Sequence, residues 1–473
     1  MRGQPSVHGG CNMKENLGFM SSSSSRSPWS WRRVALPCLL AIILRLILIG
    51  YTPTEGFADL SVCGDLAVYH ETALRLAHDA NAWFVQGSNF GYRAPLYFAY
   101  LAMIYKVTGH QTYHVGQFAG LLLLVIIMFL LYKITETWFG IKVATITVWL
   151  RAILPTFVVA DVSLMSESLF DVWLLAILMI LLAHRSGAYR ARDLFLLGLF
   201  IGAALLTRES AQGFVLILLG VLVFETHGLR ARLVRMSLML LGLGVLLIPW
   251  MWRNTLVWQS PFPLALTSGV NLHTGNNPDA TGEYVAMTQP SYMKIRTREF
   301  DRWHRDQAMQ YILEAPGRFL ISGIKKLGWL VWPWTLRTEI FDVPFFPKLP
   351  WFFRVVLVAS SSLAWAAVWL LGLVGLTTRS LDRYSWAVIL LLAYTCTLIF
   401  IAFGTPRYAE PIILLLLAPT ARVMVEFKSV ASTLRRPCLR AVSAWGAVSL
   451  VGVLWAVILR RFFCAKGLPR CPI

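Results

Sequence analysis

The feature that most restricts this chain is a series of apolar runs, each about 20 residues long, separated by short polar segments. About 20 apolar residues in an α-helix cross the hydrocarbon core of a bilayer. Hydrophobic residues make up 57% of the 473 positions and charged residues only 14%, against roughly 25% charged in an ordinary soluble domain. We therefore predict an all-α polytopic membrane protein with about eleven spans. The runs are 34–51, 113–132, 142–158, 167–184, 193–206, 210–226, 235–252, 352–376, 384–403, 409–427 and 441–459.

The distribution of basic residues predicts how the bundle is oriented. The net charge of +19 would favour nucleic-acid binding in a soluble protein, but here most of the excess falls in short loops between apolar runs. Such loops lie on the cytoplasmic side. We therefore expect a multi-pass protein of the cell (inner) membrane that contacts membrane lipids, has a cytoplasmic N-terminus and binds no nucleic acid. The basic C-terminal tail does not fit, because this topology places it outside.

The same topology divides the chain into five parts. An uncleaved first span is favoured over a signal peptide, since no clear cleavage site follows it. Residues 96–109 are apolar but contain Lys106, which favours a re-entrant or surface helix over a twelfth span. The expected parts are a disordered cytoplasmic N-terminus (1–33), a transmembrane core (34–252) with a first outer loop (52–112), a second outer loop with interfacial helices (253–351), C-terminal transmembrane helices (352–459) and a tail (460–473).

Several ionisable residues lie outside the predicted cytoplasmic loops, at the outer ends of the spans. Charges at or within a bilayer are costly, so these residues are candidates for function. Singly, such an arginine is more often a snorkelling anchor and such a carboxylate a helix cap. Their joint placement at one membrane level favours a shared site. The candidates are Asp65, Arg93, Asp161, Glu167, Arg208, Arg253 and Arg407.

Arginines that face carboxylates at a membrane surface suit one kind of chemistry. Arginine binds phosphate in a bidentate manner, and a phosphate at this level implies a lipid phosphate. Glycoside hydrolysis requires two carboxyl groups. Transfer from a lipid phosphate requires only one base, because phosphate leaves as an anion that arginines stabilise. The pattern therefore favours glycosyl transfer over hydrolysis.

A set of motifs occurs in an order that resembles the polytopic GT-C glycosyltransferases, and is most similar to the branch with protein O-mannosyltransferases and lipid A aminoarabinose transferases. The resemblance extends from Ala35 to about Arg422. The motifs are "GDLAVYHETA", "YRAPLYFAYLAMIYKVTG", "LMSESLF", "LTRES", "IPWMWRN", "GVNLHTGNNPDATG" and "RYAEP".

The resemblance implies an inverting enzyme that uses a polyprenyl-phosphate sugar on the extracytoplasmic side. Asp65 matches the catalytic acidic position, and we expect it to be a general base whose pKa burial raises toward working pH. The matched arginines would bind the donor phosphate, and the acidic turn would orient an arginine or the sugar hydroxyls. The residues expected to bind the phosphate are Arg208, Arg253 and Arg407, with Arg93. The supporting residues are Asp161, Glu167, Tyr69 and the loop residue Asn276.

Departures from the family pattern narrow the expected acceptor and leave alternatives open. Leu66 follows Asp65 where protein O-mannosyltransferases have a paired acidic motif, and the second outer loop has no room for a large β-trefoil. A lipid or glycan acceptor is therefore favoured over a protein. A divalent cation shared by the carboxylates is an open alternative that the closest branch disfavours, and no other cofactor is implied. The rival functions are a lipid-linked sugar flippase or transporter and a polysaccharide polymerase or ligase.

Overall fold

The computed structural model describes residues 32–53, 60–85, 90–183, 189–225, 228–261, 264–283, 295–333, 336, 340–341, 345–378 and 382–434. The predicted last span (441–459), the tail (460–473) and all but two residues of the predicted disordered N-terminus lie outside these ranges.

The described residues form an all-α fold, as predicted. Apart from an isolated bridge between Phe90 and Arg93, they contain no β-structure. The elements are α1 (Arg32–Ile49), α2 (Leu60–His78), η1 (Ala80–Phe84), α3 (Leu96–Thr108), α4 (Tyr113–Phe139), α5 (Ile141–Ile153), α6 (Pro155–Val162), α7 (Glu167–Ala183), α8 (Ala191–Thr207), η2 (Glu209–Ala211), α9 (Gln212–Glu225), α10 (Leu229–Trp258), α11 (Ser268–Gly275), α12 (Arg298–Glu314), α13 (Pro316–Leu330), α14 (Trp351–Thr377), α15 (Arg383–Ile401), η4 (Pro406–Ala409), α16 (Glu410–Val425) and α17 (Phe427–Leu434).

Several of these helices can cross a membrane. Within the described ranges, α4, α10, α14, α15 and the segment Pro406–Val425 are long and apolar enough, and α5 with α6 would form a sixth span. The predicted run 142–158 is thus wrong as one straight helix, because α5 and α6 meet at a bend of 61°. Pro155 begins α6, and proline disfavours helical backbone at the residue before it.

Four other predicted spans are too short or too charged to count among these helices. Helix α1 carries three arginines in its 18 residues, α7 and α8 each contain 17 residues, and α9 contains 14. The apolar helix α3 is shorter still, with 13 residues, and is not long enough to span a bilayer alone. The polytopic membrane fold is nevertheless confirmed by the number and hydropathy of the long helices.

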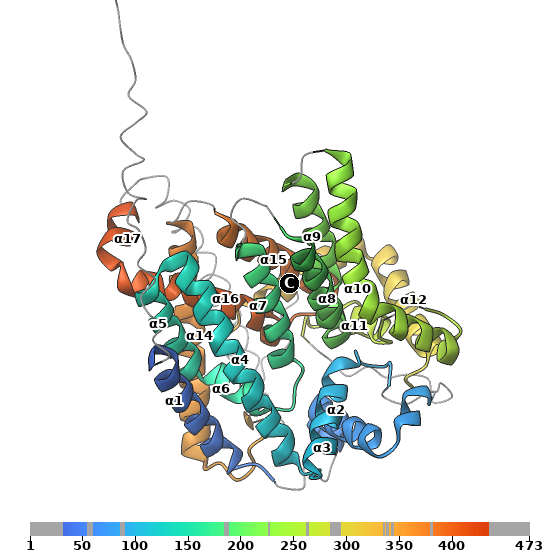
Figure 1. Ribbon diagram of the computed structural model, residues 1–473. Helices are drawn as coiled ribbons and strands as arrows, with labels where there is room; N and C mark the ends of the chain where they lie inside the picture. Colours follow the sequence, from blue (N-terminus) through green and yellow to red (C-terminus); the bar gives the residue numbers. More distant parts are fainter. Residues whose placement is uncertain are drawn as a thin grey trace, which may run out of the picture.

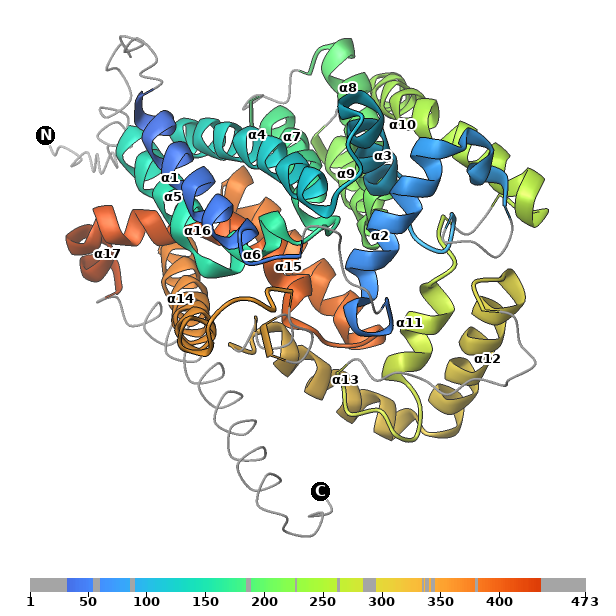
Figure 2. The same ribbon diagram turned by 90° about the horizontal axis from the view of Figure 1, so that it is seen from below.

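The helices form two groups that meet around α7 and α15. Figure 1 shows α1, α4, α5, α6 and α14 on one side and α8 to α12 on the other. In the view from below, α2 and α3 lie across the end of the bundle, with α11, α12 and α13 along its edge (Figure 2). The first outer segment (52–112) and the second outer segment (253–351), which are the two predicted outer loops, therefore cover the same end of the molecule.

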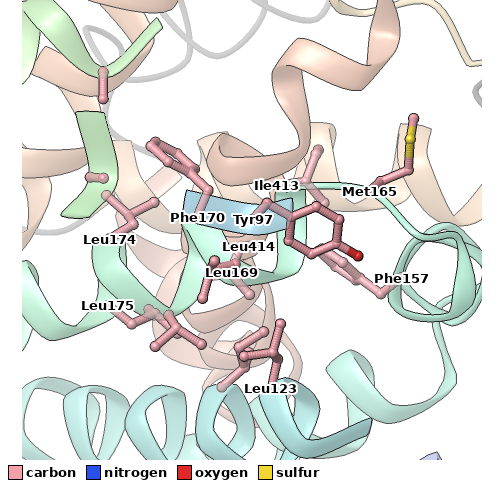
Figure 3. Packing of buried hydrophobic residues seen from close by; sticks show 14 of the residues in the cluster. Tyr97, Leu123, Phe157, Met165, Leu169, Phe170, Leu174, Leu175, Ile413 and Leu414 are labelled. Atoms are coloured by element: carbon pink, nitrogen blue, oxygen red, sulfur yellow. The ribbon is translucent and has the colours of Figure 1, made fainter. Parts of the chain in front are cut away.

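The core fixes which helix ends meet beneath these segments. Buried apolar residues of α4, α6, α7 and α16 pack together, among them Leu123, Phe157, Leu169 and Ile413 (Figure 3). Residues at the start of α7 and the start of α16 therefore lie in one layer. As a result, the charged residues that precede or begin these two helices are brought to the same end of the bundle.

Candidate active site

Asp65 lies where helix α2 changes direction. The preceding residue, Gly64, has a φ of 51° and interrupts the helical backbone. This left-handed conformation is unstrained for glycine and disfavoured for residues with a side chain. The Asp65 carboxylate contacts the guanidinium group of Arg93 through Oδ1 and that of Arg407 through Oδ2, the latter at 3.3 Å. A residue of the first outer segment is thus bound to the turn before α16.

Glu167 provides the second carboxylate of the site. It is the first residue of α7, where the positive end of the helix dipole favours a negative charge. Its Oε1 lies 2.7 Å from Nη1 of Arg208, the C-cap of α8, and also accepts a hydrogen bond from Nε of Arg407. Arg407 therefore bridges the two carboxylates.

These five side chains form one ion network, from Arg93 through Asp65, Arg407 and Glu167 to Arg208, and five separate segments contribute to it. The network is exposed at one end and buried at the other. Side-chain exposure is 31% for Arg93, 21% for Asp65 and 30% for Arg407, but 13% for Arg208 and 4% for Glu167. The structure thus brings Asp65, Arg208 and Arg407 into one network, in which Arg208 is joined to Arg407 through Glu167.

The charge state of Asp65 differs from what we expected. Burial acts to raise the pKa of its carboxyl group, but the guanidinium groups of Arg93 and Arg407 outweigh burial and hold the pKa below its ordinary value. The expected upward shift is therefore wrong for this arrangement of side chains. Asp65 is ionised at neutral pH and is held as an ion-pair partner.

Aromatic side chains surround the network. The Tyr69 hydroxyl donates to Oγ of Ser166 at 3.4 Å, and Tyr69 is buried one turn after Asp65. The guanidinium group of Arg208 lies 6.0 Å from the ring centroid of Tyr408, within the range of a cation–π contact. Tyr69 thus lies beside the catalytic candidate, as its place in the motif predicts.

A small cavity of about 40 Å³ opens beside the network. Its polar lining includes Glu167, Arg407 and Glu410, and its apolar lining includes Val159, Met165, Leu336, Phe345 and Trp365. Apolar surface therefore reaches the bridging guanidinium group directly.

Asp161 belongs to a different ion cluster. Its carboxylate accepts from Nη1 and Nη2 of Arg151 at 2.9 and 2.7 Å and from Nε and Nη2 of Arg45 at 3.1 and 2.9 Å. All three side chains are fully buried, and the arginines that Asp161 contacts are not those of the network. Arg45 and Arg151 were missed, although each is a lone charge in an apolar run, which is a functional signal in a membrane segment.

Two further carboxyl groups lie in the bundle near Glu167. Both carboxylate oxygens of Asp171, and Oε1 of Glu410, lack a hydrogen-bond partner among the described residues. Asp171 is 1% exposed and Glu410 is 4% exposed. Both interact electrostatically with Glu167 and Arg151. Asp171 was not singled out from the sequence, although it also interrupts an apolar run.

Arg253 lies outside the network. Its Nε donates to the Trp83 carbonyl at 2.8 Å and its Nη2 to the Phe90 carbonyl at 3.1 Å. The guanidinium group lies 4.9 and 5.0 Å from the ring centroids of Trp250 and Trp258. Arg253 thus binds the first outer segment to the end of α10, and its predicted contact with a donor phosphate stays a prediction.

Asn276 connects the glycine-rich loop to the turn that carries Arg407. Its amide donates to the Ile401 carbonyl at 2.7 Å and its Oδ1 accepts from Nζ of Lys326 at 2.8 Å. Burial lowers the pKa of Lys326 to about 8. The Gly404 amide also donates to the Gly282 carbonyl at 2.8 Å. The glycine-rich loop therefore supports the turn that carries Arg407. The sequence did not indicate this contact.

Glu209, next to Arg208, forms a separate contact with the second outer segment. Its Oε1 accepts hydrogen bonds from the Thr267 hydroxyl and, at 3.3 Å, from the Asn271 amide. Burial raises the pKa of Glu209 to about 7, against the opposing effects of the Thr267 hydrogen bond and the Arg93 charge.

No group of three or more metal-binding side chains that could hold an ion occurs among the described residues. Asp65, Asp161 and Glu167 each contact two guanidinium groups instead. A cation shared by these carboxylates, the alternative that the sequence left open, therefore does not fit the donor set.

Comparisons with known proteins give a family match over part of the chain and a similar fold. Residues 92–252 match the family described as dolichyl-phosphate-mannose-protein mannosyltransferase, and no curated protein matches the chain. The fold is similar to the oligosaccharyltransferase of Archaeoglobus fulgidus in its apo form, with a TM-score of 0.50, 14% identity, and coverage of 90% of this chain and 55% of that one. The same organism's AglB, in complex with an inhibitory peptide and a dolichol-phosphate, has a TM-score of 0.47 and 13% identity. That match covers 90% of this chain and 56% of AglB. The chain thus spans about half the length of these structures, and the resemblance to GT-C proteins is confirmed.

Proposed function

We propose that this polytopic membrane protein, which has the GT-C fold and a mannosyltransferase-like segment at residues 92–252, is a glycosyltransferase. It transfers a monosaccharide from a polyprenyl-phosphate donor to a lipid or glycan acceptor, with inversion, on the extracytoplasmic side of the cell membrane. The observation that carries the proposal is the ion network from Arg93 to Arg208, which five segments build at the end covered by both outer segments.

The exposed end of the network is where the donor phosphate binds. Arg93 and Arg407 are each about one-third exposed, so their free donors can reach a phosphate that approaches along the membrane. Guanidinium groups stabilise the anion that departs in the transfer step. Arg208 supports this arrangement from the buried side, because it shares Glu167 with Arg407.

Donor binding also explains how an ionised, doubly paired Asp65 becomes a base. The phosphate competes with Asp65 for the same two guanidinium groups, and loss of these partners raises the pKa of a carboxyl group. Asp65 then accepts the proton of the acceptor hydroxyl. The hydroxyl oxygen forms a bond to the anomeric carbon, and the bond from that carbon to the phosphate oxygen breaks with both electrons on the leaving polyprenyl phosphate.

The cavity beside Arg407 supports a lipid-linked donor rather than a soluble one. Its lining is mainly apolar, and its ionisable part is formed by Glu167, Arg407 and Glu410. An isoprenyl chain packed against this apolar surface would place its phosphate at Arg407. At about 40 Å³ the cavity is much smaller than pockets that hold a whole ligand, so donor binding requires the surrounding helices to separate.

The proposal is tested with purified protein in proteoliposomes and a panel of labelled polyprenyl-phosphate monosaccharides. We expect one donor to be consumed and Asp65→Asn to lower transfer by about 10²- to 10⁴-fold, the usual contribution of a positioned base. Glu71→Gln, on the same helix but outside the network, is the matched control and should retain transfer. Transfer by Asp65→Asn within a few-fold of wild type would exclude the assigned role. Movement of donor across the bilayer without transfer would favour a flippase instead.

A further inference from the structure

A second cavity lies at the opposite end of the bundle from the candidate active site. Its volume is about 660 Å³, within the range of pockets that bind small molecules. It lies between the first residues of α8 and those of α10. Helix α8 runs 17 residues from this cavity to Arg208, a distance of about 25 Å at the rise of an α-helix. In Figure 1 the start of α10 is at the top of the molecule, and α2 and α3 are at the bottom.

The shape of this cavity follows from how α8 and α10 cross. A Cβ at Gly198 would lie 1.8 Å from the Met239 carbonyl oxygen, and one at Gly242 would lie 2.0 Å from the Phe195 carbonyl oxygen. The two backbones therefore touch at these glycines, as small residues allow in membrane helices. Toward their first residues both helices contribute to the lining of the cavity. Such a space in a bilayer is occupied by lipid or protein, because an unfilled gap loses packing contacts.

The lining combines apolar and basic side chains. Leu194, Val234 and Leu238 form part of the walls, and Arg230 and Arg235 are the charged lining residues. The Arg235 guanidinium group lies 5.9 Å from the ring centroid of Tyr189, which also lines the cavity. The nearby carboxylate, Asp193, accepts from the Arg190 amide at 3.2 Å and lies 3.8 Å from Nε of Arg192. The described residues around the cavity are therefore predominantly positive.

We propose that this cavity is a binding site for an anionic phospholipid, whose phosphodiester contacts Arg230 and Arg235 and whose acyl chains fill the apolar walls. Basic pockets between membrane helices on the cytoplasmic side bind anionic head groups, and the basic loops place this end of the bundle on that side. The charge complementarity selects an anionic lipid over a zwitterionic one. The site is independent of the proposed transfer reaction.

Native mass spectrometry of the delipidated full chain tests the proposal, with phosphatidylglycerol and phosphatidylcholine of the same acyl chains as probes. Each basic side chain near an anionic surface contributes a factor of about five to affinity, so two contribute about 25-fold. We expect wild type to prefer phosphatidylglycerol by about this factor and Arg230→Gln/Arg235→Gln to lose the preference. Lys142→Gln/Lys428→Gln removes the same charge from the same end of the bundle, outside the cavity, and should retain it.

A second variant protects the test against misfolding of the double variant. Val234 is 52% exposed, so Val234→Trp fills the cavity without changing the charge or burying a polar group. We expect it to weaken phosphatidylglycerol binding at least tenfold while thermal stability is retained. Equal affinity of wild type for the two lipids, or a preference that survives both Val234→Trp and the arginine substitutions, would overturn the proposal.

Discussion

Substitution of Arg407 tests the network most directly, because this residue bridges both carboxylates. Arg407→Gln leaves Asp65 with Arg93 and leaves Glu167 with Arg208 at 2.7 Å. Removal of one partner from a buried ion pair costs about 3–5 kcal/mol when the remaining charge is uncompensated. Here Glu167 keeps a guanidinium partner and Asp65 is 21% exposed, so we expect a cost of only about 1–2 kcal/mol in the free energy of unfolding.

The expected loss of function is larger than this loss of stability. A hydrogen bond to a charged group contributes about 1.5–3 kcal/mol. Each bond from Arg407 to the donor phosphate therefore corresponds to about 10- to 100-fold in binding. Arg407→Lys keeps the charge but not the planar fork that spans Glu167 and Asp65, so its donor use should lie between wild type and Arg407→Gln.

The assay is a donor-concentration series of transfer in proteoliposomes, with thermal unfolding of the same samples. Arg318→Gln, an exposed arginine of α13, is the matched control and should behave as wild type. The reasoning is refuted if Arg407→Gln and Arg318→Gln have the same apparent KM and kcat for the donor. It is also refuted if the defect of Arg407→Gln changes with the acceptor, because a phosphate ligand acts on donor binding for every acceptor.

Two further predictions separate structural charges from functional ones. Asp161→Asn leaves Arg45 and Arg151 buried without this anion, so it should lower the free energy of unfolding by about 3–5 kcal/mol. Transfer per folded molecule, measured after thermal-shift calibration, should change only a few-fold. The Glu209 pKa of about 7 in the folded chain lies above its ordinary 4.5, so the folded state binds more protons between these values and its stability falls as pH rises from 4.5 to 7. Glu209→Gln should remove this part of the pH dependence of the melting temperature, and an unchanged slope would contradict it.

The sequence predicted the network because its members follow a simple rule. Long apolar runs define the helices, and the basic loops define their orientation. Asp65, Glu167, Arg208 and Arg407 are therefore all predicted on the outer side of the bundle, near the ends of different helices. No knowledge of packing is needed for this step, since the bilayer imposes a common level on all the turns. Arg253 satisfies the same rule but pairs with backbone carbonyls of the first outer segment, because position along the membrane normal does not determine lateral position.

The buried charges escaped prediction for a related reason. Arg45, Arg151 and Asp171 lie within apolar runs, where the surrounding residues predict a lipid-facing or core position. Which partner neutralises such a charge depends on tertiary contacts between helices far apart in sequence, such as the 116 positions between Arg45 and Asp161. The lowered pKa of Asp65 likewise depends on two guanidinium groups from distant segments, whose distances a single sequence does not contain.

The near balance of arginines and carboxylates in the network follows from the energetics of burial. A guanidinium group held ready for phosphate beneath a membrane surface would be costly to desolvate without an anion beside it. In the proposed mechanism, Asp65 supplies that anion while the site is empty and is released when the donor phosphate takes its place. Glu167 is almost fully buried and shared by two arginines, so it remains paired throughout. Under the proposal, one carboxylate is therefore exchangeable and the other permanent, and their different exposure is the reason to propose Asp65 rather than Glu167 as the base.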